Sequence, residues 1–208
     1  MASKQTAISN VNNDAKELIT EPFTIQLKIQ GVSDLLFHRW SNEDVEEKNT
    51  AAKGSKTKKT DNIEAYIYRD ENNYICMPGR YLNRAIVEAA RFHQDLRSSR
   101  KMAKDLVQAA VIVPTMLAPI LVNDKPTSDW DYLDRQRVVI QRAGITRVRP
   151  AFTAGWKAQF NVTSLLPEYV TPQFLRRLVQ DSGKFIGLAD FRPTYGRFDV
   201  IEWKELNE

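Results

Sequence analysis

The chain has 208 residues, of which 42% are hydrophobic and 27% charged, with a formal net charge of +4. These values are typical of one soluble globular domain with a sizeable core. The single cysteine excludes an internal disulfide framework and a four-cysteine zinc site, and no apolar run reaches the ~18–20 residues that span a bilayer. We therefore expect a cytoplasmic protein with no membrane partner and no cofactor.

The first third of the chain predicts an arm, one strand and one hairpin. Residues 1–20 are polar and are predicted to form a flexible arm ahead of a single domain over 21–208. Phe23–Ile29 alternates apolar and polar residues, which predicts a half-buried strand. Residues 41–62 lack apolar periodicity and are predicted to be an inserted mobile loop. Ala65–Tyr68 and Tyr74–Met77 flank a turn-rich pentapeptide and predict a β-hairpin.

The middle third begins with a helix and continues with strands. Leu82, Ala85, Ile86 and Ala89 have helical spacing, so a helix is predicted over 80–93. Residues 107–122 are rich in β-branched residues and contain two prolines, which predicts strand with an edge or a bulge. Residues 123–152 are too long for a hairpin loop, and we expect them to form a second insertion that projects from the domain.

The last third predicts a strand, a helix and a final strand. Trp156, Ala158, Phe160 and Val162 alternate with polar residues, which predicts a strand over 156–166. Thr171-Pro172 predicts a helix start, with threonine as the N-cap and proline at the first position. The helix is expected to end at Gly183, and a strand is predicted over 197–205.

Without the insertions, the predicted order is strand, helix, strand, strand, helix, strand. This order indicates the α+β class and specifically the ferredoxin-like, RNA-recognition-type βαββαβ sandwich. Two helices are then expected to pack on one face of a four-stranded antiparallel sheet. The other face of the sheet would be free for another use.

Positive charge is concentrated in the middle of the chain. Residues 80–160 hold fourteen lysines and arginines against seven acids, and 135–160 contain five arginines, one lysine and no acid. Such a strip favours a phosphate polymer as partner, although a solvated face or an arginine-rich subunit interface has the same composition. On the first interpretation, replacing Arg142, Arg147 and Arg149 with alanine should weaken binding and leave the melting temperature nearly unchanged.

A loop near the C-terminus has the composition of a ligand-binding segment. Gly187 and Gly196 bracket it, and glycine allows the close approach of a backbone to a ligand. Phe191 and Tyr195 are predicted to stack on bases, while Arg192 and Arg197 are predicted to contact phosphates. The alternative is a surface loop whose aromatic residues pack on the sheet.

The sequence contains little material for catalysis. It has no phosphate-binding glycine-lysine loop, no nucleophile elbow and no paired-histidine zinc motif. His38 and Cys76 lie in apolar patterns and are predicted to be packed, and His93 is predicted to cap a helix end or to contact phosphate. We therefore predict no catalytic residue, no metal site and no enzymatic activity.

Two stretches resemble a known family. Ile75-Cys76-Met77-Pro78-Gly79, followed by Arg80–Ile86, resembles the strand and Pro-Gly turn before the first helix of the RAMP superfamily, with Asn83 at a usual glycine. These CRISPR-associated proteins include the backbone subunits that polymerise along guide RNA. The resemblance implies a thumb at the long excursion and a ligand role for the loop over 187–198. Where members cleave RNA, it implies an aspartate after the first strand, in the region of Asp34 and Asp61.

The resulting hypothesis is a non-catalytic protein that binds single-stranded nucleic acid, RNA rather than DNA, and oligomerises along the strand. Other effector subunits are further expected partners, and a phage-encoded relative fits the same resemblance. The alternatives are a protein-binding or inhibitory protein that uses the arginine-rich excursion, and a single-strand annealing protein. The predicted contact residues are Arg80, Arg84, Arg135, Arg137, Arg142, Arg147, Arg149, Lys157, Phe191, Arg192, Tyr195 and Arg197.

Overall fold

A twisted antiparallel sheet forms the centre of the protein. The computed structural model describes residues 21–39, 50, 62–140 and 143–206, so the predicted arm and nearly all of the predicted insertion over 41–62 lie outside the described residues. The central strand β1 (Phe23–Gly31) pairs antiparallel with β10 (Lys157–Ser164) on one side and with β11 (Phe198–Leu206) on the other. Every second residue of β1 is buried, as the alternation predicts.

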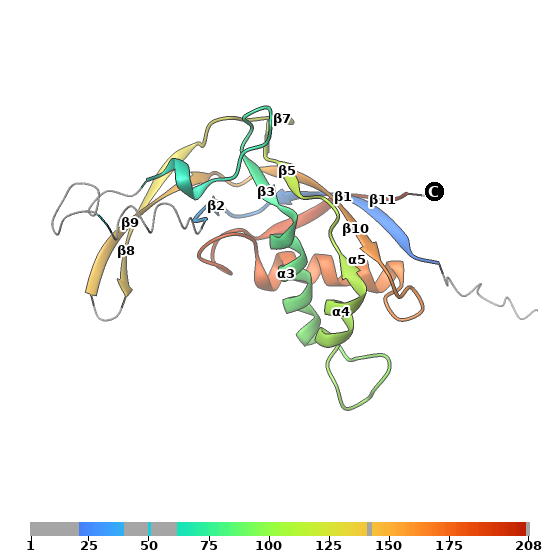
Figure 1. Ribbon diagram of the computed structural model, residues 1–208. Helices are drawn as coiled ribbons and strands as arrows, with labels where there is room; N and C mark the ends of the chain where they lie inside the picture. The colour runs from blue at the N-terminus through green and yellow to red at the C-terminus, as the bar shows by residue number, and fades with distance from the viewer. Residues whose placement is uncertain (1–20, 40–49, 51–61, 141–142, 207–208) are drawn as a thin grey trace, which may run out of the picture.

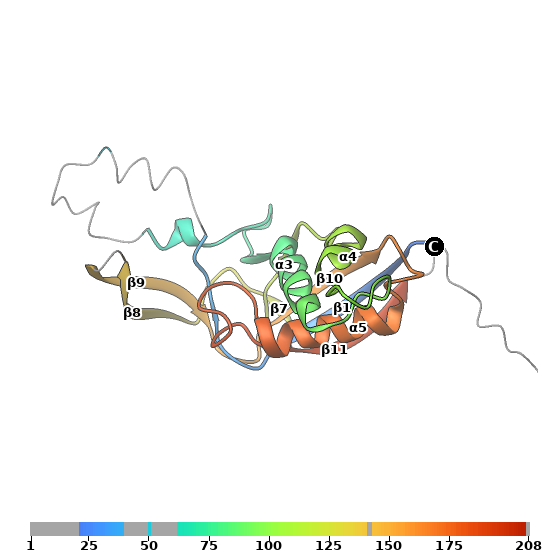
Figure 2. The same ribbon diagram turned by 90° about the horizontal axis from the view of Figure 1, so that it is seen from below.

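Three helices cover one face of this sheet. They are α3 (Gly79–Ala89), α4 (Lys104–Ala110) and α5 (Pro172–Asp181), and they lie across β1, β10 and β11 in Figures 1 and 2. A short 3-10 turn, η2 (Ala90–Phe92), extends α3. Ile25, Leu27 and Phe160 from the sheet join the apolar faces of the helices in one core. Within the described residues, no helix is long and apolar enough to cross a membrane.

The α+β class predicted from the sequence is confirmed, but the strand predicted over 107–122 is broken into pieces. Residues 104–110 form α4, and β4 (Val111–Ile112), β5 (Leu117–Pro119) and β6 (Leu121–Val122) follow. The sheet has the order β11-β1-β10-β6-β7, with β4 also pairing with β10. A continuous second strand is therefore replaced by β4 and β6, each of which pairs with β10 over only one or two residues.

The hairpin predicted over 65–77 is reduced to a tight turn. Its first arm begins in a 3-10 turn, η1 (Glu64–Tyr66), and pairs with the second arm only through the bridge between Arg69 and Ile75. Asp70 holds the turn, because its carboxylate accepts hydrogen bonds from the backbone N–H groups of residues 72 and 74. The strand β3 (Cys76–Pro78) pairs instead with β5.

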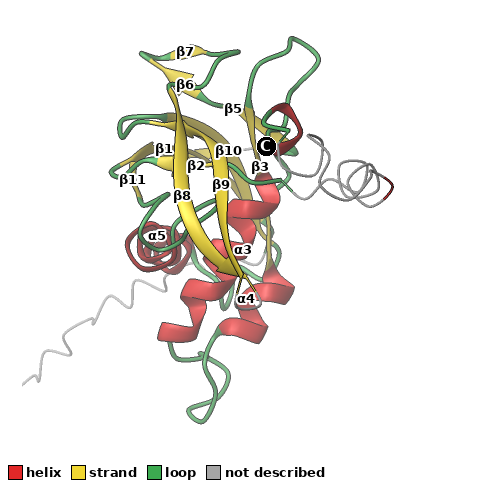
Figure 3. Ribbon diagram, turned by 90° about the vertical axis from the view of Figure 1, so that its left-hand side faces the viewer, coloured by secondary structure: helices red, strands yellow, loops and turns green. Residues whose placement is uncertain are grey.

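The excursion over 123–152 contains a long β-hairpin. After β7 (Lys125–Pro126), the strands β8 (Tyr132–Ile140) and β9 (Ala143–Phe152) pair antiparallel along their whole length. The short strand β2 (Leu35–Leu36) joins the base of β9. Figure 1 shows the hairpin projecting away from the helices and the central sheet, and Figure 3 shows β8 and β9 side by side in front of them.

The helix α5 begins where the sequence predicts. The Thr171 hydroxyl accepts a hydrogen bond from the Phe174 N–H, and Pro172 occupies the first helical position. Its predicted end is wrong, because residues 182–186 continue as a single π-helical segment, η3 (Ser182–Ile186). Gly187, with φ 76°, ends this segment. Gly183 instead allows close packing, since a Cβ there would lie 2.1 Å from the Phe198 carbonyl oxygen.

Candidate nucleic-acid interface

The loop from Gly187 to Gly196 is fastened to the domain at both ends. Gly187 and Gly196 have φ values of 76° and 73°, and the Leu188 N–H donates to the Gly196 carbonyl across the base of the loop. The Gly196 N–H donates to the carbonyl of Asp34, and the Asp190 N–H donates to that of Leu36. The loop is therefore held in one place, between α3 and the projecting hairpin (Figure 2).

Arg149 joins this loop to the hairpin from inside the protein. It is only 5% exposed, and its Nε donates to Oδ2 of Asp190 at 2.5 Å. Its guanidinium carbon lies 4.4 Å from the ring centroid of Phe191. Arg149 is therefore part of the fold, and its predicted place on a surface strip is wrong.

The two aromatic residues of the loop are half-buried. Tyr195 accepts a hydrogen bond from the Gln136 side chain on β8 at 3.0 Å, and its ring lies edge-on to Phe191. Phe191 contacts the Arg149 guanidinium. These contacts attach the loop to the hairpin. They give both rings a structural role beside the base stacking that the sequence predicts.

A groove separates α3 from this loop. A hollow of about 480 Å³ lies between them. The helix lines it with Arg80, Tyr81, Asn83 and Arg84, the loop lines it with Ala189, Asp190 and Arg192, and His38 lies beside Asp190. Leu82, Ala85 and Ile86 face the core, so the helix turns Arg80 and Arg84, four residues apart, toward solvent. The structure thus brings three predicted contact residues together: Arg80, Arg84 and Arg192.

The groove continues along α3 into a second hollow of about 630 Å³. Arg84, Ala189, Asp190 and Arg192 line both, and Arg91 lines the far part. The carboxylate of Glu88 also lies there and pairs with Lys104, Arg84 and Arg91. The hydrogen bond from Lys104 is the main cause that lowers the pKa of Glu88. One carboxylate is thus surrounded by three cations, which leaves this stretch positive.

Arg39, which no sequence pattern singled out, lies next to the groove in a hollow that shares Arg80 and Asn83 with it. The Arg39 guanidinium lies 4.7 Å from the centroid of the Tyr68 ring, and Arg80 lies 5.4 Å from the same centroid. Tyr68 is itself edge-on to Tyr81, and burial is the main cause that raises the pKa of Tyr81. Arg39 stands alone in its stretch of sequence, and only the fold places it beside Tyr68 and Arg80.

The acid-free arginine run does not form one surface. Arg135 and Arg137 are exposed on β8, opposite Val148 and Thr146. Arg147 and Arg149 lie opposite Gln136 and Asp134 and therefore occupy the other face of the hairpin. Arg142 lies outside the described residues.

Two further predicted cations are engaged within the protein. Lys157 donates to both carboxylate oxygens of Asp124 at 2.8 Å, and these bonds are the main cause that lowers the pKa of Asp124. The exposed Arg197 donates from Nε to the Pro193 carbonyl at 2.7 Å. Arg80, Arg84 and Arg192 are thus the predicted cations that line the groove beside α3, and the predicted aromatic residue Phe191 lines its far part.

Asp34 lies in the region where the resemblance implies a cleaving aspartate. Both of its carboxylate oxygens accept hydrogen bonds from other parts of the protein. Oδ2 accepts a hydrogen bond from the Tyr132 hydroxyl at 2.6 Å, and Oδ1 accepts one from the Ala154 N–H at 2.9 Å. Asp61 lies outside the described residues. Among the residues that are described, no three histidine, cysteine or acidic side chains are grouped to hold a metal ion. Cys76 is buried, and burial raises its pKa to about 11.

The chain is similar to known proteins in structure and not in sequence. No family model and no curated protein sequence matches the chain. A chain from a Type III-B Cmr-beta complex, solved by cryo-electron microscopy with cognate target RNA bound, superposes with a TM-score of 0.52 at 8% identity, over 90% of this chain and 61% of that chain. Cmr6 from Pyrococcus furiosus superposes at a TM-score of 0.45 and 11% identity, over 87% of this chain and 98% of that chain.

The superposition on the Cmr-beta chain shows that the two chains have a similar fold. This chain spans about three fifths of the length of the Cmr-beta chain that it matches. This chain therefore shares its fold with that chain, as the resemblance at Ile75–Ile86 and the loop over 187–198 implies.

Proposed function

We propose that the protein binds single-stranded nucleic acid, RNA rather than DNA, in the groove between α3 and the loop over 187–196. The observation that carries this proposal is the convergence of Arg80, Arg84 and Arg192 on one hollow from segments about a hundred residues apart. Arginine is well suited to bidentate contact with phosphate. The choice of RNA is supported by the fold that the protein shares with a chain from an RNA-bound complex.

The proposed role is binding without catalysis. Both carboxylate oxygens of Asp34 accept hydrogen bonds from other parts of the protein, so this side chain is held away from the role of a general base. Specificity for base sequence is not required of such a groove, because phosphate contacts hold a strand whatever its bases are.

The double variant Arg84→Ala/Arg192→Ala should bind a labelled ten-nucleotide RNA about 5- to 150-fold more weakly than the unmodified protein. Each guanidinium that binds a phosphate also releases a counterion, so the slope of log affinity against log salt should become shallower by about 1 for each arginine removed. Fluorescence anisotropy between 50 and 200 mM salt measures both quantities, with a DNA strand of the same sequence in parallel.

The matched control for this measurement is Arg177→Ala. Arg177 is an exposed arginine on α5 that lines neither hollow, so its removal lowers the net charge without touching the groove. The control should keep the affinity within about twofold, since exposed substitutions are usually small in effect. The control loses one positive charge and the double variant loses two. A control that loses half or more of the binding free energy lost by the double variant would therefore reduce the binding to non-specific attraction by net charge and would refute the groove.

We further propose that copies of the protein assemble side by side on a long strand and act beside other effector subunits. The projecting hairpin supports this proposal, because it carries the exposed Arg135 and Arg137 away from the groove toward a neighbouring copy or its strand. Contacts that repeat head to tail give open filaments. Light scattering at micromolar protein should show particles that grow with strand length. A monomer with and without a long RNA would contradict the proposal.

A further inference from the structure

Two phenylalanines are exposed at the far end of the groove. Phe92 on η2 is 56% exposed and Phe185 on η3 is 52% exposed, and their rings meet edge to face with centroids 5.6 Å apart. Large aromatic side chains gain most from burial. Such a pair on the surface therefore indicates a contact with another molecule.

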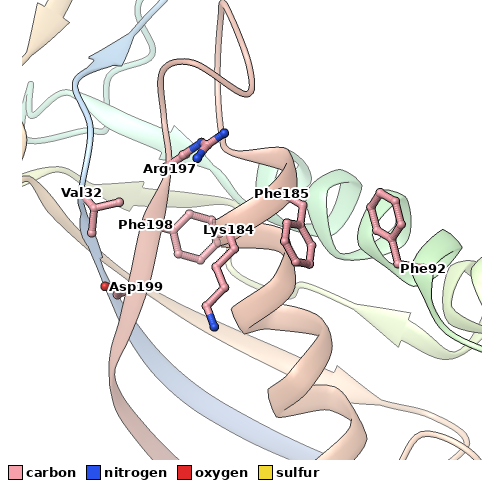
Figure 4. Close-up of a pocket in the computed structure, with 8 residues that line it drawn as sticks. Val32, Phe92, Lys184, Phe185, Arg197, Phe198 and Asp199 are labelled. Carbon is pink, nitrogen blue, oxygen red and sulfur yellow. The ribbon is translucent and has the colours of Figure 1, made fainter.

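The pair lies where two hollows meet. Phe92 and Phe185 line the far part of the groove with Arg84, Arg91 and Arg192. They also line a separate hollow of about 720 Å³, whose other side includes Val32 and Phe198 (Figure 4). A strand that follows α3 from Arg80 would reach these rings next.

The charges around the pair favour a nucleic acid over an apolar protein segment. The Arg91 guanidinium lies 5.8 Å from the Phe92 ring centroid. Lys184 and Arg197 line the separate 720 Å³ hollow beside Phe185, and one acid, Asp199, lies there too. Exposed aromatic rings within a set of cations are the combination that holds single strands, because bases stack on the rings while cations hold the phosphates.

We propose that Phe92 and Phe185 form a stacking site for nucleobases of the strand whose phosphates lie along α3. This inference rests on the proposed function and extends it from phosphate contact to base contact. From Arg80 to Phe92 the helical path rises about 18 Å at ~1.5 Å per residue, which a strand spans with at most about five nucleotides, since ~3.4 Å is the rise per nucleotide in a fully stacked duplex and an extended strand rises more. A strand of ten nucleotides is therefore long enough to occupy the groove and the stacking site together.

The test compares a labelled ten-nucleotide RNA with an abasic strand that has the same backbone and no bases. The variants Phe92→Ala and Phe185→Ala should bind the RNA about 5- to 100-fold more weakly, as expected when base stacking is removed. Their affinity for the abasic strand should change less than about twofold. Phe185→Trp should bind the RNA as tightly as the unmodified protein does. Phe185→Leu should bind it as weakly as Phe185→Ala does, because leucine keeps an apolar surface without a ring.

Leu165→Ala is the control, because Leu165 is another partly exposed apolar residue that lines neither hollow. It should leave both affinities unchanged, and thermal unfolding of each variant checks the fold. Equal weakening on both strands, or unchanged RNA affinity in both phenylalanine variants, would overturn the stacking site while the groove stands. If the unmodified protein binds neither strand, the proposed function itself fails. Full RNA affinity in Phe185→Leu would show that an apolar contact without a ring is sufficient and would also overturn the proposal.

Discussion

Gly196→Ala is expected to lower the free energy of unfolding by about 2–5 kcal/mol and to weaken nucleic-acid binding. A side chain at φ 73° costs about 1–2 kcal/mol. The added Cβ would also lie 1.9 Å from the Leu188 carbonyl oxygen, and overpacking of this kind costs about 1–3 kcal/mol more. Because Leu188 is in the backbone pair that closes the loop, the displacement would move the wall of the groove that carries Arg192. Urea unfolding and RNA anisotropy measure the two effects.

Gly155→Ala separates the two causes. Gly155 also has a positive φ, 103°, but a Cβ there would meet no atom within 4 Å. It should therefore show only the cost of the backbone conformation, about 1–2 kcal/mol, and should leave binding unchanged. If the two variants were destabilised equally, the contact with Leu188 would be unimportant. The loop would then not depend on glycine for its closure.

The elements that the sequence predicted well are those whose signal is local. The alternation over Phe23–Ile29 predicts a strand with one buried face, and Thr171-Pro172 predicts a helix start. Each pattern depends only on the backbone geometry of the residues that form it. The segment over 107–122 was predicted less well. Leu106, Val107 and Ala110 bury one side of a helix of only seven residues, a length at which helical periodicity cannot be told from a β-branched strand.

The candidate site was predicted in its residue types more than in its arrangement. The charge count found the basic middle of the chain, but it could not divide alternate residues of β8 and β9 between two faces, because that division depends on the hairpin register. Arg39, Phe92 and Phe185 carry no sequence motif. Arg39 lies over the same ring as Arg80, and Phe92 and Phe185 line the far part of the groove, only because the fold brings these distant segments together.

Arg149→Met is expected to lower the free energy of unfolding by about 2–4 kcal/mol. Methionine keeps much of the buried volume, but it removes the hydrogen bond to Asp190 and the contact with Phe191. A bond between charged groups contributes about 1.5–3 kcal/mol, and a shielded cation over an aromatic ring up to about 2 kcal/mol. Arg135→Ala, on the exposed face of the same hairpin, should change stability by less than about 0.5 kcal/mol.

A double-mutant cycle with Asp190→Asn tests whether Arg149 stabilises the fold through its ion pair with Asp190. If the ion pair fastens the loop to the hairpin, the effects of the two substitutions should not add, and the coupling should be about 1–3 kcal/mol. Additive effects would mean that Arg149 stabilises the hairpin without holding the loop. Nε of Arg149 is bound to Asp190, while Nη1 is buried and has no hydrogen-bond partner among the described residues. The contribution of this arginine to stability should therefore come mainly through Asp190 and Phe191, both in the loop that forms one wall of the groove.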